Sequence, residues 1–536
     1  MSPLSLNSRP ARALAFLLFC ALALGVAAYL HLSLPNIPDR DALYHYRHAA
    51  LYRERGPLMR EFPWTAFSVI STLKSDIWYG FHLFLLPFTL SADPVRGVKL
   101  AGVGDLFALL LLSYLAMRCA RLRLSFLWPF LLISFAPYLL YRLVMTRPHV
   151  ISMGLAALLL SCTISGGIWA VALVSFLLTF VHLGLFWIIP LILGVVAFVV
   201  RLTEERWLWR ETLAALLGGA LGWLLRPNPL GAAKLVYIQI VQLALEKQKG
   251  VPLLFGADLV SGLKAMAIHQ GGFLQHFAPA TLVWLAAVIA LFAAVGHQAK
   301  LTPNQRTFLW STLALSALTF AIMMQFSLRA VDLWAVFAIA FVASVFSFIL
   351  RPGAAARTGF SAPSQLRLIT LLGALLVGFI FFRAFDEHST RMKKLGYSPY
   401  RFKAAAQYLQ QHSEPGDIVF HAHWDLFPDL FFWNTHNHYI GGMDPIFQYA
   451  YSPSLYWEAH HLWTGQYSSY TCPTVYCTPA QGEDTFTVLT RDFRARFLVL
   501  EPKRHPALYA YASKDTRFRK VLADEEVAVF DLIPAR

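Results

Sequence analysis

The chain has 536 residues, of which 57% are hydrophobic and 14% are charged, and its mean hydropathy is +0.52. Soluble domains carry about 25% charged residues, and several apolar runs here reach or approach the ~20 residues that cross a bilayer. The composition excludes an ordinary soluble protein and indicates a polytopic membrane protein. The net charge of +15 does not predict a nucleic-acid partner, because many arginines stand at the ends of apolar runs, as in a positive-inside bias.

The first apolar run covers about residues 13–30 and is preceded by Arg9 and Arg12. A signal peptide is the alternative, but no small-residue cleavage site follows the run. We therefore predict a retained first span with a cytoplasmic N-terminus. Residues 32–99 are too polar to span as a whole and form a long outer loop. Within it, the short run 77–90 is typical of a membrane-surface helix.

Ten further apolar runs bring the predicted number of spans to about eleven. Arginines are frequent in the loops on the N-terminal side of the membrane and sparse in the loops on the opposite side, which supports this assignment of the spans. A second long outer loop covers 226–276, and the transmembrane domain as a whole covers 1–382. The ten runs are 100–117, 126–141, 149–164, 168–182, 184–200, 208–225, 277–295, 307–324, 333–350 and 366–382.

Residues 383–536 differ in character, and the odd number of spans places them across the membrane from the N-terminus. Apolar segments at 417–420, 496–500 and 527–530 alternate as strands do, and helical patterns at 399–412 and 453–464 separate them. Strands that alternate with helices predict an α/β domain of about 150 residues.

The five cysteines fall into two groups. Cys20, Cys119 and Cys162 lie in or beside apolar runs and read as small buried hydrophobic residues. Cys472 and Cys477 stand in a loop of the C-terminal domain, where an oxidising compartment would favour a disulfide. Half of a zinc site is the alternative for this pair.

Two carboxylates follow the first span, in the segment Pro38-Asp39-Arg40-Asp41-Ala42-Leu43-Tyr44-His45-Tyr46-Arg47-His48. At the outer face, Asp39 and Asp41 could act as a general base or hold a divalent metal. The alternative is a solvated loop with helix-capping aspartates.

The run from Asp41 to Arg47 resembles the first outer loop of GT-C membrane glycosyltransferases, most closely the Asp-Pro-x-x-x-Tyr-Arg type of oligosaccharyltransferase catalytic subunits. The resemblance implies a catalytic carboxylate at Asp41, with Asp39 as second choice. It also implies sugar transfer from a polyprenyl-phosphate carrier and a topology of one span, a long outer loop, further spans and an outer α/β domain.

A second resemblance lies in the segment from Pro415 to Asp425, which is similar to the strand leading into the Trp-Trp-Asp-Tyr-Gly motif of oligosaccharyltransferases. That motif recognises the acceptor sequon. Only Trp424 and Asp425 match it here, since His423 replaces the first Trp and Leu426-Phe427 replace Tyr-Gly. The resemblance therefore implies an acceptor role for Trp424 and Asp425 but does not predict asparagine glycosylation.

Three arginines stand in short outer loops, where cations must be paired or face water. Arg142, Arg147 and Arg329 are predicted to contact the donor phosphate, since arginine suits bidentate phosphate contacts. For Arg142 and Arg147 the alternative is snorkelling to lipid headgroups, and Asp332 is the alternative partner of Arg329.

A divalent metal, Mg²⁺ or Mn²⁺, is a possible cofactor. The resemblance implies that a carboxylate of the late outer loop completes the site of Asp41, and Glu246 is the candidate. A second possible metal set consists of histidines and an aspartate in the C-terminal domain. No Gly-rich phosphate loop is present, so no nucleotide cofactor is predicted. The members of the second set are His421, His423, Asp425, His436 and His438.

The sequence thus predicts a GT-C-like polytopic α-helical membrane protein with a C-terminal periplasmic α/β domain, placed in a bacterial inner membrane. The predicted activity is transfer of a sugar or oligosaccharide from a polyprenyl-phosphate donor, drawn from the lipid bilayer, to an unidentified glycan, lipid or protein acceptor. The alternative is a non-enzymatic membrane protein, either a transporter or a lipid-binding assembly partner. The scarcity of ionisable residues within the apolar runs argues against a transporter.

Overall fold

The computed structural model describes residues 9–253, 272–293, 301–349, 396–478 and 480–532, with short pieces between 382 and 394. The chain forms two compact units. Unit 1 comprises residues 1–38, 99–223 and 257–396, and unit 2 comprises residues 39–98, 224–256 and 397–536. Most of the predicted span 366–382 lies outside the described residues.

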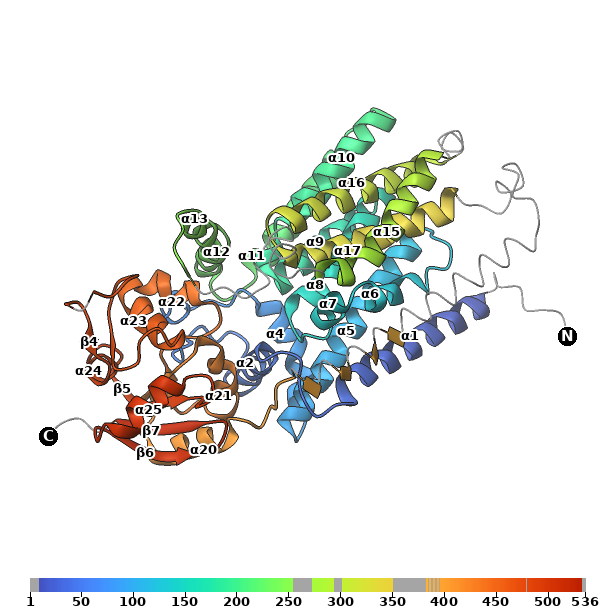
Figure 1. The fold of residues 1–536 in the computed structure, drawn as a ribbon. Helices are drawn as coiled ribbons and strands as arrows, with labels where there is room; N and C mark the ends of the chain where they lie inside the picture. Colours follow the sequence, from blue (N-terminus) through green and yellow to red (C-terminus); the bar gives the residue numbers. More distant parts are fainter. Residues whose placement is uncertain are drawn as a thin grey trace. The chain divides into compact units, whose positions relative to one another are not determined.

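Unit 1 is a bundle of helices, and its labels appear in Figure 1. Three short 3-10 segments precede α-helices of this unit: η2 (Trp128–Phe130), η3 (Leu183–Leu185) and η7 (Leu328–Ala330). A π segment, η8 (Val345–Ile349), follows the last helix, α17. The α-helices are α1 (Arg9–Leu32), α5 (Pro94–Cys119, its first turn in unit 2), α6 (Leu131–Ser134), α7 (Pro137–Leu143), α8 (Pro148–Ser165), α9 (Ile168–Val181), α10 (Ile188–Glu204), α11 (Trp209–Leu224), α15 (Gly272–Ala293), α16 (Pro303–Gln325) and α17 (Val331–Ser344).

The multi-span helical fold is confirmed. Among the described residues, six helices are long and apolar enough to cross a membrane, and three shorter apolar helices accompany them. The predicted single span at 126–141 is wrong as one helix, because η2, α6 and α7 divide it. Pro129 and Pro137 stand at the starts of η2 and α7, and proline lacks the N–H that an uninterrupted helix would need there.

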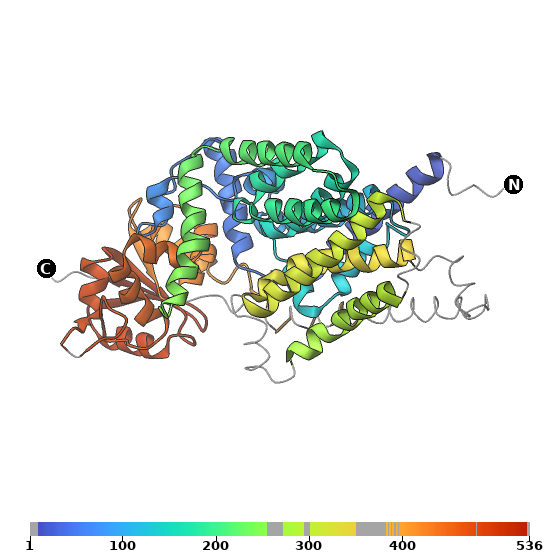
Figure 2. The ribbon, with the colours of Figure 1, turned by 90° about the horizontal axis from the view of Figure 1, so that it is seen from above.

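The centre of unit 1 is the segment Leu328–Ile349, which includes α17. This span is 89% buried inside the protein, whereas the span of α1 is 22% buried. Helices α16 and α17 contact each other along their length, and both views show them side by side (Figures 1 and 2). A helix that is apolar on all sides and buried on all sides is a core helix, so α17 organises the bundle and α1 lies at its edge.

Helices α9 and α11 approach so closely that two glycines are required between them. A Cβ atom on Gly218 would collide with the backbone carbonyl of Ala172, and one on Gly222 with that of Phe176. The two glycines are four residues apart and share one face of α11, as in the small-xxx-small contacts of membrane helices. The backbones therefore meet directly at this crossing.

Unit 2 combines outer-loop segments with the C-terminal region. Residues 39–98 and 226–256 belong to outer loops of the predicted transmembrane domain, and in space they pack with residues 397–536. Its helical segments are α2 (Asp41–Arg55), α3 (Val69–Leu73), α4 (Tyr79–Leu85), η1 (Leu86–Leu90), α12 (Pro229–Tyr237), η4 (Ile238–Gln242), α13 (Leu243–Gln248), α20 (Lys403–His412), η9 (Trp424–Leu426), α21 (Phe427–Trp433), α22 (Pro445–Tyr451), α23 (Pro453–Trp463), α24 (Thr485–Arg491) and α25 (Pro506–Lys514).

The predicted α/β character of the C-terminal region is confirmed by a five-stranded sheet with the order β2-β1-β5-β7-β6. Strand β1 pairs in parallel with β2 and β5, and β7 pairs antiparallel with β5 and β6. The central strands are almost wholly buried, as expected for strands covered on both faces. The strands are β1 (Ile418–His421), β2 (His438–Tyr439), β5 (Ala495–Leu500), β6 (Phe518–Ala523) and β7 (Ala528–Leu532), and β3 (Tyr470–Thr471) pairs separately with β4 (Glu483–Asp484).

The first outer loop attaches to the edge of this sheet. The N–H of Tyr439 in β2 donates to the carbonyl of Trp64, and the N–H of Ala66 donates back to the carbonyl of Tyr439. The indole Nε1 of Trp64 also donates to the backbone of Thr435 at 2.8 Å. These bonds join segments about 370 residues apart, and they hold the loop that precedes α3 and α4 against the sheet.

The glycine contact between α9 and α11 yields a test. We expect Gly218→Ala to lower the melting temperature of the detergent-purified protein by several degrees, because the new methyl group forces two backbones apart. Gly219→Ala is the matched control: its Cβ would lie 3.4 Å from Ile189 and Thr179, an ordinary contact, and alanine favours a helix by about 1 kcal/mol over glycine. Equal melting temperatures for the two variants would contradict this account of the crossing.

Candidate functional site

Asp41 is the first residue of α2, and this helix carries much of the chemistry of unit 2. The residue that precedes it, Arg40, is the N-cap and makes no side-chain capping bond. Positions 41, 45, 48 and 52 recur at helical spacing, so Asp41, His45, His48 and Tyr52 share one face. Apart from the half-buried Asp41, this face is buried. The helix thus presents one carboxylate at its start and imidazoles along the following turns.

Arg40 is buried among carboxylates. Its guanidinium lies 3.4 Å from Asp425, 3.5 Å from Asp429 and 3.5 Å from Glu501, and it covers the ring of Tyr397 at 4.6 Å from the centroid. A buried guanidinium is tolerated only when it is paired and hydrogen-bonded. These contacts therefore fix the start of α2, and with it the position of Asp41, against β5, η9 and α21.

Asp425 contacts both the buried Arg40 and the more exposed Arg504. Its carboxylate accepts from Arg504 at 2.9 Å and lies 2.6 Å from Nδ1 of His423. Burial alone would raise the pKa of Asp425, but His423, Arg40 and Arg504 together hold that pKa below its usual range. The predicted acceptor residue Asp425 is thus a charged member of this ion-pair group, while its neighbour Trp424 is half-buried in η9.

Asp429 behaves differently from Asp425 although both contact Arg40. Burial, with Asp425 and Glu501 as negative neighbours, raises the pKa of Asp429 to about 7 despite the attraction of Arg40. Glu501 is also bound by Arg401 at 2.6 Å and by Arg504 at 3.2 Å. The group therefore holds one carboxylate whose charge changes near neutral pH.

Unit 1 gathers basic side chains from segments that are far apart in sequence. His149 in α8 lies within electrostatic reach of Arg142, Arg147 and His182, and His182 in turn is within reach of Arg329. The C-terminal ends of α7 and α9, the start of α8 and η7 thus meet at one place. The predicted phosphate residues Arg142, Arg147 and Arg329 are brought into one neighbourhood, with His149 and His182 beside them.

Within this neighbourhood, Arg142 has a dedicated partner. Its Nε and Nη2 atoms each donate to Asp332 at 2.7 Å, and both side chains are buried. Asp332, predicted as an alternative partner of Arg329, is thus bound by Arg142. A bidentate buried pair is a structural contact, so Arg142 holds α7 against α17. The contact of Arg142, Arg147 and Arg329 with a donor phosphate stays a prediction.

Asp41 and Glu246 are the pair predicted to hold a metal. Glu246 in α13 is bound by Lys249 at 3.0 Å and lies beside Tyr449. Among the described residues, neither Asp41 nor Glu246 belongs to a set of three donors close enough to share an ion. The Mg²⁺ or Mn²⁺ cofactor at Asp41 stays a prediction.

The histidines of the C-terminal domain are dispersed among backbone contacts. The ring nitrogens of His421 lie near the carbonyls of His423 and Gly441, and His436 contacts the carbonyl of Ser413. In the described part of the chain, these residues do not form a three-donor set either. Cys472 and Cys477 are joined in a disulfide, so their sulfur atoms are not thiolate ligands.

Two features of unit 2 were missed from the sequence. Arg40 stands between Asp39 and Asp41, and this arginine flanked by acids was the signal for a buried ion-pair centre. His82 lies in the run 77–90, which was read only as a surface helix, and Asp76 directly precedes that run; the structure places both beside His48. The two histidines of α2, His45 and His48, stand three residues apart and were the signal for such a partner.

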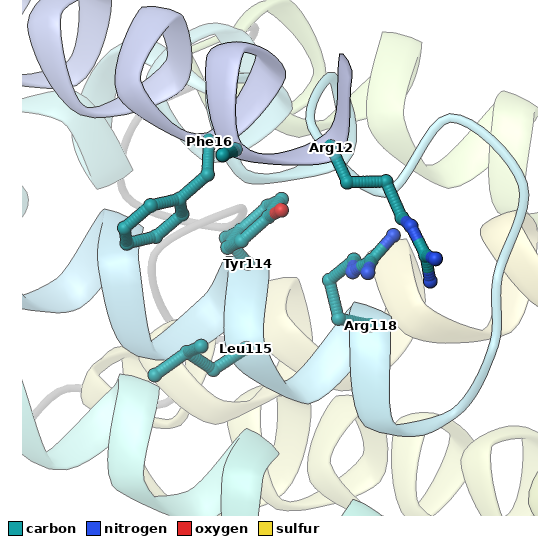
Figure 3. Close-up of a pocket in the computed structure, with 6 residues that line it drawn as sticks. Arg12, Phe16, Tyr114, Leu115 and Arg118 are labelled. Carbon is teal, nitrogen blue, oxygen red and sulfur yellow. The ribbon is translucent and has the colours of Figure 1, made fainter. Parts of the chain in front are cut away.

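A shallow hollow of about 450 Å³ lies between α1 and α5 (Figure 3). Arg12 and Arg118 extend to the same side of it, and Phe16, Tyr114 and Leu115 line its floor. None of the predicted site residues lines this hollow.

Comparison with known proteins gives the fold. No family model and no curated relative matches the chain. Among solved structures, the crystal structure of Archaeoglobus fulgidus oligosaccharyltransferase, tethered to an acceptor peptide containing the NVT sequon, has a TM-score of 0.59 at 13% identity and covers 97% of this chain and 74% of that chain.

ArnT from Cupriavidus metallidurans is similar over its full length. Its apo structure has a TM-score of 0.54 at 14% identity, and its structure bound to undecaprenyl phosphate has a TM-score of 0.53 at 15% identity. Each covers 97% of this chain and 98% of that chain. Both neighbours are GT-C membrane glycosyltransferases, so the predicted GT-C fold is confirmed.

The raised pKa of Asp429 yields a test by pH. Because its folded pKa of about 7 lies above the ordinary value of 3.8, the folded state holds this proton more tightly than the unfolded state between these two values. Its contribution to stability is present at low pH and is lost as pH rises through about 7. We expect the melting temperature of the wild type, relative to Asp429→Asn, to fall by several degrees between pH 5 and pH 8.

Glu61→Gln serves as the control for this measurement, since Glu61 is an exposed carboxylate outside the ion-pair group and its loss reports the effect of removing one negative charge. A difference between wild type and Asp429→Asn that stays constant over the same pH range would show that Asp429 does not titrate there.

Proposed function

We propose that this chain is a membrane glycosyltransferase that moves a sugar or oligosaccharide from a polyprenyl-phosphate-linked donor to an acceptor at the outer face of a bacterial inner membrane. The observation that carries the proposal is the extent of the GT-C likeness. It covers 97% of the chain, so the membrane helices and the α/β region are both retained. An undecaprenyl phosphate is bound in one of the similar ArnT structures, which supports a lipid-linked donor.

In the proposed reaction, a nucleophilic atom of the acceptor forms a bond to the anomeric carbon of the donor sugar. The bond between that carbon and the phosphate oxygen breaks, and its electron pair leaves with the polyprenyl phosphate. The acceptor proton passes to the carboxylate of Asp41. Asp41 is half-buried at the first turn of α2, which supports a role in which a positioned carboxylate meets substrate.

The leaving phosphate would be stabilised by Arg147 and Arg329. Both are half-buried and lie in the basic neighbourhood of unit 1, and guanidinium groups favour developing negative charge on phosphate oxygens. Trp424 and Asp425 are assigned to the acceptor side, where Asp425 also holds Arg40 and hence the start of α2. Asp39, buried beside this start, is the second candidate for the catalytic carboxylate.

The proposed orientation places the N-terminus in the cytoplasm and unit 2 in the periplasm. The excess of arginine in loops on the N-terminal side supports it. The disulfide between Cys472 and Cys477 also supports it, since structural disulfides persist in oxidising compartments.

The role of Asp41 is tested with the full chain in detergent and a radiolabelled undecaprenyl-phosphate sugar. Asp41→Asn should lower donor consumption by a factor of about 10² to 10⁴, the usual contribution of a positioned base, with donor binding and melting temperature nearly unchanged. Glu54→Gln, at the other end of α2, should keep full activity. Wild-type protein that is folded yet neither binds nor consumes any donor would favour the non-enzymatic alternative.

The different roles of the arginines give a second test. Arg329→Gln should weaken binding of undecaprenyl phosphate at least tenfold and, because Arg329 is half-buried, should lower the melting temperature less than Arg142→Gln does. Arg142→Gln should lower the melting temperature strongly, because breaking a buried pair costs about 3–5 kcal/mol when one charge is left behind. Titration of the lipid phosphate against both variants, each with its thermal melt, separates them. Equal thermal effects of the two substitutions would contradict this division of roles.

A further inference from the structure

We propose that His48, Asp76 and His82 form a binding site for one divalent transition-metal ion of the Zn²⁺ type, which fastens the first outer loop of unit 2. This site is separate from Asp41 and does not depend on the proposed transferase activity. Its three donor atoms all lie within 4.8 Å of one another. Two imidazoles and one carboxylate form a ligand set that Zn²⁺ prefers.

The geometry at Asp76 carries the inference. Oδ2 of Asp76 lies 2.6 Å from Nδ1 of His82 and 4.0 Å from Nε2 of His48. The second distance is too long for a hydrogen bond, yet the ring of His48 lies over that of His82, with centroids 4.2 Å apart. Bonds of about 2.1 Å to a tetrahedral Zn²⁺ place neighbouring donor atoms roughly 3.4 Å apart. Shifts of less than about 1 Å would therefore seat an ion between the three groups.

The outer contacts of the imidazoles match those of metal-bound histidines. Nε2 of His82 lies 2.8 Å from Nδ1 of His45, and Nδ1 of His48 lies 3.0 Å from the hydroxyl of Tyr44. A histidine that binds a metal through one ring nitrogen usually has the other nitrogen held by a hydrogen-bond partner. His45 and Tyr44 therefore fix the orientation of the two rings, and Nδ1 of His82 and Nε2 of His48 face Asp76.

The carboxylate is supported in the same way. Oδ1 of Asp76 accepts the backbone N–H of Trp78 at 2.8 Å, and the hydroxyl of Tyr52 donates to Oδ2 at 2.8 Å. Tyr52 thus brings a further oxygen donor to the same place. Arg226 is also close, and it donates to the backbone carbonyl of Asp76 at 3.0 Å. The carboxylate itself contacts the imidazoles, the hydroxyl of Tyr52 and the backbone N–H of Trp78.

Burial makes the site a structural one. The side chains of His82, His48 and Asp76 are 0%, 6% and 6% exposed. They come from three separate places: the middle of α2, the turn before α4, and α4 itself. An ion held by all three would tie these segments together, as closed zinc sites do in proteins with little local core.

The alternative to a bound metal is a chain of hydrogen bonds, in which His45 donates to His82 and His82 donates to Asp76. Only the first arrangement contains a metal, so a measurement of metal content distinguishes the two. We would purify the full chain without a histidine tag, wash it with a weak chelator and measure metal by inductively coupled plasma mass spectrometry. The expected result is about one zinc per chain in the wild type and loss of most of it in Asp76→Asn and His82→Gln.

Two further variants keep the test decisive if these substitutions disturb folding. His48→Cys should retain zinc, because a thiolate is also a zinc ligand, whereas His48→Ala should lose it. His505→Gln, which changes another buried histidine of unit 2, should retain zinc as the control. A wild type that holds no transition metal even after incubation with Zn²⁺, or zinc retained by an Asp76→Asn/His82→Gln double variant, would overturn the proposal.

Discussion

The buried guanidinium of Arg40 is the contact on which the arrangement of unit 2 depends. It meets carboxylates from η9, α21 and the end of β5, so the first residue before α2 is fixed by three separate segments of the C-terminal region. Removing one partner of a buried ion pair leaves an uncompensated charge at a cost of about 3–5 kcal/mol. The start of α2, including Asp41, is thus positioned by charge pairing, and packing of the aromatic face of the helix adds to it.

This constraint gives the C-terminal domain a defined part in the proposed chemistry. Asp425, which the resemblance assigned to acceptor recognition, is held by His423, Arg40 and Arg504. Its influence on the acceptor would be exerted through the position of the ion-pair group and of the half-buried Trp424 next to it. A change of acceptor in this fold could then arise from residues around η9, while the helix that carries Asp41 stays in place.

Sequence patterns predicted the periodic parts of the fold well. Alternation at 496–500 and 527–530 found β5 and β7, and long apolar runs found the helices around α17. Prolines inside an apolar run, as at Pro129 and Pro137, produced a false continuous span, because hydropathy averages over a break that the missing N–H enforces. The ion pair of Arg142 with Asp332 was also out of reach, since its residues are 190 positions apart and no local pattern links them. The same holds for the attachment of residues 64–67 to the sheet.

That attachment has a consequence for biosynthesis. The edge of β2 is covered by a segment that is synthesised about 370 residues earlier. Arg40 is likewise synthesised 461 residues before its partner Glu501. Non-local pairing of this kind slows folding, and until β2 is made the backbone groups of residues 64–66 can pair with other chains. The first outer loop therefore emerges long before its sheet exists, and the newly made chain must be protected over this interval until the last strands complete it.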